Sequence, residues 1–305
     1  MSGTVLITGA NGFIGTRLVK ELSTTTNVVA TYRTEKPADI HVPGVKYIKC
    51  DLIDLNGTYK LFENNSIDAV VHTAAVVKSD EDNNCLNYTF KNNVEAQANI
   101  LSAALSSKCK KFIFCSTISV YDGHPIHKNG FRESDCVIPN SIYGWSKYSG
   151  EEMLRVATSE KGMNCISLRF SGVHGYGRNT GVVFNMINSA IQGNEILINE
   201  PHSIFKLTFI EDVVSSILIA LSSSKLLGYS CYNVSGKEAL SLPDLASIIK
   251  SICNSNCKVN IINNGGKRYQ VMDTHKAQLD LNFNPLSIQE KINNYKELII
   301  NKQNN

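Results

Sequence analysis

Strong charge of either sign is lacking from this sequence of 305 residues, whose formal net charge is only +3. No run of Lys and Arg forms the basic stripe typical of nucleic-acid-binding proteins, so no nucleic-acid partner is expected. Long apolar runs are also lacking, and none approaches the roughly 20 residues that a membrane-spanning helix needs. The first residues do not resemble a signal peptide. We therefore expect a cytoplasmic protein that binds no membrane.

Paired cysteines are a third absence. The nine cysteines are odd in number and include no Cys-x-x-Cys pair. Several, such as Cys115 and Cys165, lie within apolar segments, which is typical of buried free thiols in a reducing compartment. No cluster of His, Cys and Asp has the spacing of metal ligands, so no metal is expected.

Short apolar runs alternate with segments of helical periodicity in the first part of the chain. Runs this short, buried on both faces, predict an α/β fold with a doubly wound parallel sheet covered by helices. The expected strands are Thr4–Thr8, Val28–Tyr32, Lys46–Cys50, Ala69–His72, Lys111–Cys115 and Cys165–Arg169. The expected helices are Gly12–Leu22, Leu55–Glu63, Asn92–Leu105 and Ser141–Glu160.

After about Gly172 the pattern loosens. We expect residues 1–170 to form the sheet domain, and residues 171–305 to form mainly a smaller lobe with some segments that return to the sheet domain. The expected elements are a strand at Lys206–Ile210 and helices at Val182–Gln192, Asp212–Leu221, Ser241–Ser251 and Ile288–Ile300. The third helix has a capping residue, Ser241, and Pro243 in its first turn.

A glycine-rich loop, Thr8-Gly-Ala-Asn-Gly-Phe-Ile-Gly15, joins the first expected strand to the first helix. Glycines let the backbone approach a pyrophosphate, and the helix N-terminus offers free N–H groups to its negative charge. The loop predicts a Rossmann-type dinucleotide site, with contacts from Gly9, Gly12, Phe13, Ile14 and Gly15.

The end of the second strand bears on the choice of dinucleotide. An acidic side chain there would bind both hydroxyls of the adenosine ribose, but this strand is followed by Arg33, with Lys36 close behind. An arginine forms bidentate contacts with phosphate. The sequence therefore favours NADP(H) over NAD(H), although NAD(H) remains possible.

Tyr143 and Lys147 lie four residues apart and share one face of an expected helix. A neighbouring ammonium favours the phenolate, so this tyrosine can act as an acid or base near neutral pH. A hydroxyl that could hold the reacting oxygen stands at Ser116-Thr117, just after an expected strand. The pattern predicts proton transfer by Tyr143, assisted by Lys147 and Thr117.

The chain resembles the extended short-chain dehydrogenase/reductase family, which contains nucleotide-sugar epimerases, dehydratases and reductases. The resemblance covers nearly the whole sequence. Besides the glycine loop, it rests on Asp51-Leu52, Asp68–Ala75, Asn92-Asn93-Val94, Ser116–Tyr121, Tyr143–Lys147, Leu168-Arg169, Phe209–Asp212 and Asn282–Pro285.

This resemblance implies roles for individual residues. Asp51 and Leu52 would contact the adenine, and Ala74 and Ala75 would lie beside the pyrophosphate and ribose. Asn93 would support the cofactor side of the cleft. Lys147 would also bind the nicotinamide ribose, Thr117 would hydrogen-bond the reacting oxygen, and the nicotinamide would be bordered by Phe170 and Val173.

The resemblance also separates the possible reactions. Family members that dehydrate sugars carry Asp-Glu after the catalytic threonine, where this chain has Ile118 and Ser119. Combined epimerase-reductases carry a cysteine where this chain has Ser119. Simple keto reduction and 4-epimerisation remain, and Arg33 favours the reductase because it suits a dissociable NADPH.

The expected substrate is a nucleotide-activated 4-keto-6-deoxyhexose. Ser119, Arg178 and Lys206 are candidates to contact it, the two cations as phosphate ligands. A hydroxysteroid-like or flavonoid-like ketone is an alternative, and an NADP-sensing regulator is another. The resemblance further implies a homodimer formed through the helices around Asn92–Leu105 and Ser141–Glu160.

Overall fold

The computed structural model describes residues 3–34, 42–77, 85–125, 129–263 and 265–303. The chain divides into two compact units, each built from several segments. Unit 1 comprises residues 1–123, 133–169 and 214–232, and unit 2 comprises residues 124–132, 170–213 and 233–305. A segment beyond residue 213 therefore returns to the first unit.

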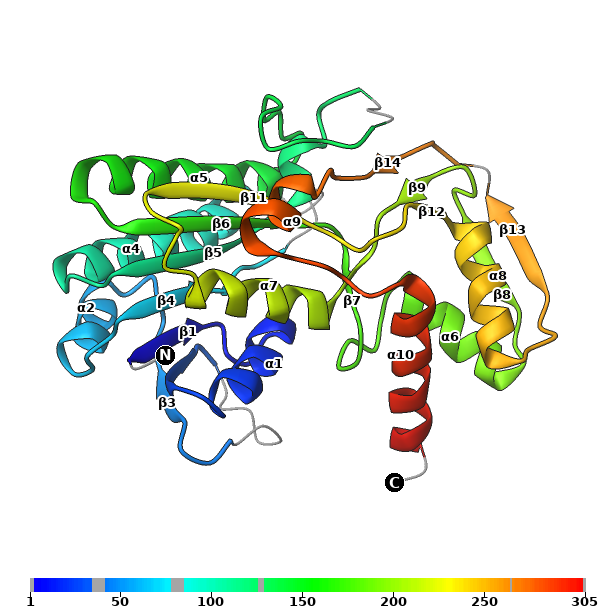
Figure 1. Ribbon diagram of the computed structural model, residues 1–305, viewed down its shortest axis with the longest axis horizontal. Coiled ribbons are helices and arrows are strands. Elements are labelled where there is room, and N and C mark those ends of the chain that lie inside the picture. Colours follow the sequence, from blue (N-terminus) through cyan, green and yellow to red (C-terminus); the bar gives the residue numbers. More distant parts are fainter. Residues whose placement is uncertain (1–2, 35–41, 78–84, 126–128, 264, 304–305) are drawn as a thin grey trace. The chain divides into compact units, whose positions relative to one another are not determined.

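Within the described residues, unit 1 is built on a sheet of seven strands in the order β11-β6-β5-β4-β1-β2-β3 (Figure 1). The pairs β3–β2, β2–β1, β1–β4 and β4–β5 are parallel. The predicted α/β, Rossmann-type fold class is confirmed. The strands are β1 (Thr4–Thr8), β2 (Asn27–Tyr32), β3 (Lys46–Lys49), β4 (Ala69–His72), β5 (Lys111–Thr117), β6 (Asn164–Phe170) and β11 (Tyr229–Val234).

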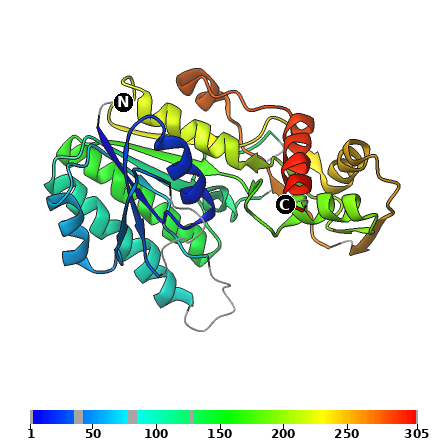
Figure 2. The ribbon, with the colours of Figure 1, turned by 90° about the horizontal axis from the view of Figure 1, so that it is seen from below.

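Helices cover both faces of this sheet (Figures 1 and 2). On one face lie α1 (Phe13–Leu22) and the later turns of α7 (Ile210–Ser222), and on the other lie α2 (Leu55–Glu63), α4 (Ala96–Ser106) and α5 (Ile142–Lys161). The shorter elements are α3 (Cys85–Thr89), the π-helical turn η1 (Phe90–Glu95) and the 3-10 turn η2 (Ile118–Tyr121).

The sheet strands are buried on both faces, as their apolar runs indicate. All four residues of β4 are buried, and Leu6, Val70 and Phe112 are fully inaccessible. The predicted helix at Asn92–Leu105 differs in its first turn, because residues 90–95 are π-helical and the α-helix begins only at Ala96.

Unit 2 contains three small sheets in the part of the chain that the structure describes. Its strands are β7 (Val173–His174), β8 (Ile196–Asn199), β9 (Ile204–Phe205), β10 (Thr208–Phe209), β12 (Leu240–Ser241), β13 (Val259–Asn263) and β14 (Tyr269–Gln270). Its helices are α6 (Val182–Gln192), α8 (Leu242–Cys253), α9 (His275–Leu281) and α10 (Ile288–Gln303).

The predicted strand at Lys206–Ile210 is wrong in its bounds. Only Thr208–Phe209 is a strand, and α7 begins at Ile210. Two acidic residues, Glu211 and Asp212, fall in the first turn of α7, where a carboxylate favours the positive end of the helix dipole. The predicted cap of α8 is confirmed, since Ser241 accepts a hydrogen bond from the N–H of Asp244.

One buried ion pair fastens α10 to the start of α7 within unit 2. Lys291 donates to Oδ1 of Asp212, and both side chains are almost inaccessible. Oδ2 of Asp212 has no hydrogen-bond partner. Burial raises the pKa of this carboxyl, whereas the hydrogen bond from Lys291 lowers it. Without the lysine, the carboxylate would remain buried and unpaired.

We predict that Lys291→Met destabilises the protein by about 3–5 kcal/mol, because removal of one partner leaves a buried charge uncompensated. Urea unfolding measures this loss. The matched control is Lys110→Met, whose ion pair with Asp68 is exposed and should contribute no more than about 1 kcal/mol. Equal losses in the two variants would contradict the prediction.

Candidate active site

The glycine loop between β1 and α1 has no room for side chains at Gly9 and Gly15. Gly9 has a φ of +67°, and a Cβ there would lie 2.8 Å from Cα of Ala74. A Cβ on Gly15 would lie 2.1 Å from the carbonyl oxygen of Gly9. The N–H of Gly12 closes the turn by donating to the same oxygen at 2.9 Å. No side chain caps α1 at Gly12, so the exposed backbone fits a pyrophosphate.

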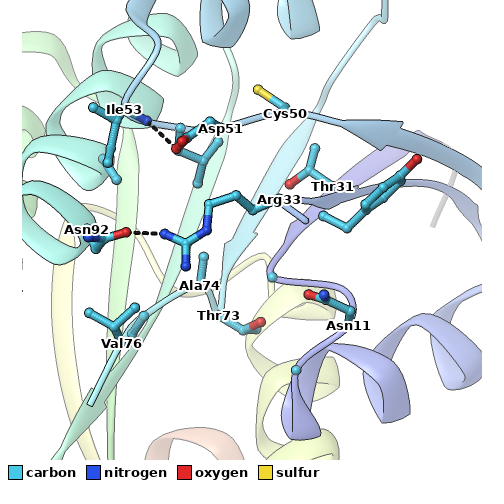
Figure 3. Close-up of a pocket in the computed structure, with 16 residues that line it drawn as sticks. Asn11, Thr31, Arg33, Cys50, Asp51, Ile53, Thr73, Ala74, Val76 and Asn92 are labelled. Carbon is cyan, nitrogen blue, oxygen red and sulfur yellow. Dashed lines mark hydrogen bonds between the residues drawn. The ribbon is translucent and has the colours of Figure 1, made fainter. Parts of the chain in front are cut away.

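A pocket opens beside this loop, at the carboxyl ends of β1 to β4 (Figure 3). Ligands of open α/β sheets bind at this edge. Among the residues predicted to contact the cofactor, the pocket is lined by Gly9, Gly12, Arg33, Asp51, Leu52, Ala74 and Ala75. Phe13, Ile14 and Gly15 form the first turn of α1 and are not part of this lining. Sequence reasoning missed Thr31, Cys50, Thr73, Val76 and Asn92, which also line it.

Arg33 extends from the end of β2 toward Asn92 (Figure 3). Its guanidinium donates a hydrogen bond to Oδ1 of Asn92. Nδ2 of Asn92 donates to the carbonyl of Tyr88 at 2.7 Å, which orients the amide so that its oxygen faces Arg33. A positive charge is thus held at the pocket wall. Lys36, the second cation noted in the sequence, lies outside the described residues.

The π-helical turn at residues 90–95 gives two adjacent asparagines different surroundings. Asn92 lines the pocket, whereas Asn93 is buried. Asn93 accepts from the N–H of Val76 at 2.8 Å and donates to its carbonyl at 3.0 Å. It also donates to Oγ of Ser146 on α5 at 3.0 Å. Asn93 therefore joins the pocket wall at Val76 to the helix that carries Tyr143 and Lys147.

The structure brings Thr117 and Tyr143 together. Thr117 ends β5, Tyr143 lies in the first turn of α5, and their side chains are hydrogen-bonded. Burial and the nearby Cys115 raise the pKa of Tyr143 to about 12, while the hydrogen bond with Thr117 lowers it. Lys147 is not among the groups that shift this pKa, so its expected acidifying effect on the phenol stays a prediction.

Lys147 is buried behind Tyr143. Its Nζ lies 4.4 Å from the ring centroid of Phe114. Burial lowers the pKa of Lys147 to about 8, and the nearby Cys115 and Glu151 raise it. His72 is also buried near this lysine, and its Nδ1 shares a hydrogen bond of 2.8 Å with the hydroxyl of Thr8. Burial lowers the pKa of His72 to about 3. The site thus combines a protonated phenol, an ammonium and a neutral imidazole.

Sequence reasoning missed the role of a buried carboxylate on α5. Glu151 accepts hydrogen bonds from Ser116 on β5 and Arg169 on β6. The available signal was spacing, because Glu151 stands four residues after Lys147 and so shares its helical face. Arg169 belongs to the Leu168-Arg169 motif on which the family resemblance rests, but no role for it was predicted from the sequence.

The residues predicted near the substrate make contacts inside their own units. Ser119 donates its N–H to Oγ1 of Thr117 at 3.2 Å in unit 1. In unit 2, Arg178 donates to the carbonyl of Val173 at 2.7 Å. Lys206 donates to the carbonyl of Met272 at 3.3 Å, and burial lowers its pKa. Of the two residues predicted to border the nicotinamide, Phe170 is buried and Val173 is in β7.

Among the residues that the structure describes, no helix is both long and apolar enough to cross a membrane. The His, Cys, Asp and Glu side chains of these residues form no group of three or more that could hold a metal ion.

Known proteins resemble this chain along most of its length. The ADP-L-glycero-D-manno-heptose-6-epimerase of Brachyspira hyodysenteriae is 28% identical over 82% of this chain and 81% of its own. The dTDP-4-dehydro-6-deoxy-D-allose reductase of a Streptomyces species is 28% identical over the same shares, 82% and 81%. The UDP-glucuronic acid 4-epimerase of Bacillus cereus, solved with UDP-glucuronic acid and NAD, matches with a TM-score of 0.84, 25% identity and coverage of 98% and 99%.

A model of the NAD dependent epimerase/dehydratase family matches residues 5–235, which include the glycine loop, the pocket and the Thr117–Tyr143–Lys147 group. That span is well over half of the chain, and it holds the residues whose geometry fits a nicotinamide dinucleotide. The chain belongs to the NAD dependent epimerase/dehydratase family.

Proposed function

We propose that this protein is an NAD(P)H-dependent reductase of a keto group on a nucleotide-activated sugar, with a 4-keto-6-deoxyhexose as the leading substrate. The observation that carries the proposal is the hydrogen-bonded pair Thr117 and Tyr143, with Lys147 one turn further along α5. Neither Ile118 nor Ser119 beside it can supply the acid-base chemistry of a dehydration. The similarity to a dTDP-4-dehydro-6-deoxy-D-allose reductase supports this choice.

In this reaction, the pocket would hold a nicotinamide cofactor, which would supply the hydride. Thr117 and Tyr143 hold the carbonyl oxygen of the substrate, and Tyr143 donates its phenolic proton to that oxygen. Because the pKa of Tyr143 is raised to about 12, the phenol carries its proton at neutral pH, as a general acid must. Lys147 contributes its positive charge beside the oxygen and would bind the nicotinamide ribose.

Arg33 supports NADPH as the reductant. Its guanidinium lies in the pocket wall, held by Asn92, at the end of β2 where the adenosine ribose binds in this fold. A guanidinium there would pair with a 2′-phosphate. Asp51, after β3, would contact the adenine, together with Leu52.

Unit 2 would provide most of the substrate contacts. We assign substrate binding mainly to residues 171–305, with Arg178 and Lys206 as candidate ligands of the diphosphate. Phe170 and Val173 would border the nicotinamide, and Ser119 would contact the sugar. Both cations now donate to backbone carbonyls, so each would exchange that contact for a phosphate oxygen.

A 4-epimerase acting on a nucleotide sugar is the second candidate. The relevant observation is the similarity to a UDP-glucuronic acid 4-epimerase solved with NAD. Epimerisation uses the same Thr117, Tyr143 and Lys147, but it leaves the cofactor unchanged after each turnover. The two functions therefore differ in net cofactor consumption.

We also propose a homodimer formed through α4 and α5. The outer faces of these helices line a groove that is mainly apolar. Trp145 and Val156 on α5 are 43% and 41% exposed, and Leu101 and Leu105 line the groove from α4. A second copy would remove Trp145 and Val156 from water.

We predict that Tyr143→Phe lowers kcat by about 10²- to 10⁴-fold, because the general acid is lost while the ring still packs. The assay is NADPH oxidation with a panel of nucleotide-linked 4-keto-6-deoxy sugars. Tyr148→Phe, the same change on the same helix, is the control and should retain activity. Full turnover by Tyr143→Phe would remove this residue from the mechanism.

Net consumption of the cofactor, measured with keto-sugars and with UDP-sugars, separates the two candidate functions. A reductase consumes one NADPH for each keto-sugar, whereas an epimerase interconverts UDP-sugars without net oxidation of the cofactor. Epimerisation by protein that retains NAD on purification would overturn the reductase proposal.

We predict that Arg33→Ala weakens NADPH binding by roughly 10- to 100-fold, which corresponds to the loss of a hydrogen bond to a charged group. Binding of NADH should be almost unchanged, because NADH has no 2′-phosphate. Calorimetric titration of both cofactors measures the difference, and Arg155→Ala, an exposed change on α5, is the control. A wild-type preference for NADH would refute the assignment of Arg33.

A further inference from the structure

Next to the proposed catalytic residues lies a buried ion pair between α5 and β6. The side chains of Glu151 and Arg169 are 1% and 5% exposed. Nε of Arg169 donates to Oε1 of Glu151 at 2.9 Å, and a terminal nitrogen of the guanidinium donates to Oε2. A two-pronged contact of this kind fixes the relative position of two side chains more tightly than a single hydrogen bond.

The pair also reaches β5 and η2. Ser116 on β5 donates to Oε1 of Glu151 at 2.5 Å. Arg169 donates to the hydroxyl of Tyr121 on η2 and lies 4.9 Å from the centroid of that ring. Four elements are therefore joined through one carboxylate and one guanidinium.

These contacts are adjacent to the residues that carry the proposed chemistry. Ser116 directly precedes Thr117 in β5. Glu151 stands one helical turn beyond Lys147 and two turns beyond Tyr143. Helix α5 is continuous through these positions. The hydrogen bond between Ser116 and Glu151 therefore fixes the position of α5 along β5, and with it the position of Tyr143 relative to Thr117.

Stability alone is a poor explanation for a charged pair in this place. Two ions lose their hydration when they are buried, and a well-packed apolar pair of similar volume is often equally stable or more so. Catalysis, by contrast, depends steeply on placement, since an error of about 1 Å can slow a reaction by roughly 100-fold. The ion pair is thus better explained by its effect on the positions of the adjacent residues Thr117, Tyr143 and Lys147.

We propose that Glu151 is a positioning residue that, with Ser116 and Arg169, sets Tyr143 against Thr117 and maintains a negative charge beside Lys147. This inference rests on the catalytic roles proposed above. It does not depend on which sugar is reduced, nor on the choice between NADPH and NADH.

The charge part of the proposal depends on the groups around Lys147. His72 on β4 is neutral, because burial lowers its pKa to about 3. Cys115 on β5 is a neutral thiol, because burial raises its pKa to about 12. Tyr143 on the same helix keeps its proton for the same reason. Glu151 is then the carboxylate that opposes the effect of burial on Lys147, whose pKa is lowered to about 8.

The direct test is the pKa of Lys147 in cofactor-free protein, followed by NMR of labelled lysine side chains. We expect Glu151→Gln to lower this pKa further, because the neighbouring negative charge is removed. The control is Glu152→Gln, since Glu152 is the next residue and forms an exposed pair with Arg155 at 2.8 Å. An unchanged pKa in Glu151→Gln would overturn the charge part of the proposal.

The kinetic test follows kcat and its pH profile with the substrate that the wild type turns over. We expect Glu151→Gln to lower kcat by about 10- to 100-fold, with little change in the KM of the cofactor. If Lys147 must be protonated, activity falls as pH rises through its pKa, so this limb should move to lower pH. Ser116→Ala removes only one contact and should lower kcat without moving the limb.

A double variant separates positioning from folding. Glu151→Gln/Arg169→Met removes both charges and should be more thermally stable than Glu151→Gln, which leaves Arg169 buried and unpaired. We expect its kcat to stay low and its pH limb to stay shifted. Recovery of kcat and of the pH profile together with stability would show a purely structural pair and overturn the proposal. Full turnover by Tyr143→Phe would instead refute the proposed chemistry, while the NMR result would stand.

Discussion

Helix α5 can lie so close to the sheet only because residue 150 has no side chain. A Cβ on Gly150 would lie 2.2 Å from Oε1 of Gln97 on α4 and 2.7 Å from the ring of Phe114 on β5. Gln97 also donates to the carbonyl of Gly150 at 3.0 Å, so two helices and a strand meet at one point. The same approach brings Nζ of Lys147 to 4.4 Å from the Phe114 ring centroid. A helix held further out would leave this lysine hydrated and its pKa near the ordinary value.

Burial then shifts the pKa of three groups near this contact. It favours their neutral forms, which raises the pKa of Tyr143 and lowers those of His72 and Lys147. At neutral pH the phenol is therefore protonated, the imidazole is neutral and the ammonium is charged. A proton donor and a nearby cation are the groups that the proposed keto reduction requires.

The sequence predicts those parts of the structure that local pattern determines. The strands of the sheet appear as short apolar runs, and the glycine loop is recognisable because only glycine fits at Gly9 and Gly15. Two-residue strands such as β9 and β10 leave no periodic signal. A return of some segments to the sheet domain is expected from the sequence, but that these are residues 214–232 depends on long-range packing. The ion pair between Glu151 and Arg169 likewise cannot be predicted from the sequence. The spacing shows only that Glu151 shares a helical face with Lys147.

The π-helical turn at residues 90–95 joins the pocket wall to α5. In this turn Asn92 contacts Arg33 at the pocket wall, whereas Asn93 holds Val76 and Ser146. π-helical turns frequently occur at functional sites. Here two adjacent residues of the turn make contact in two directions, one with the pocket wall at Arg33 and the other with Ser146 on α5.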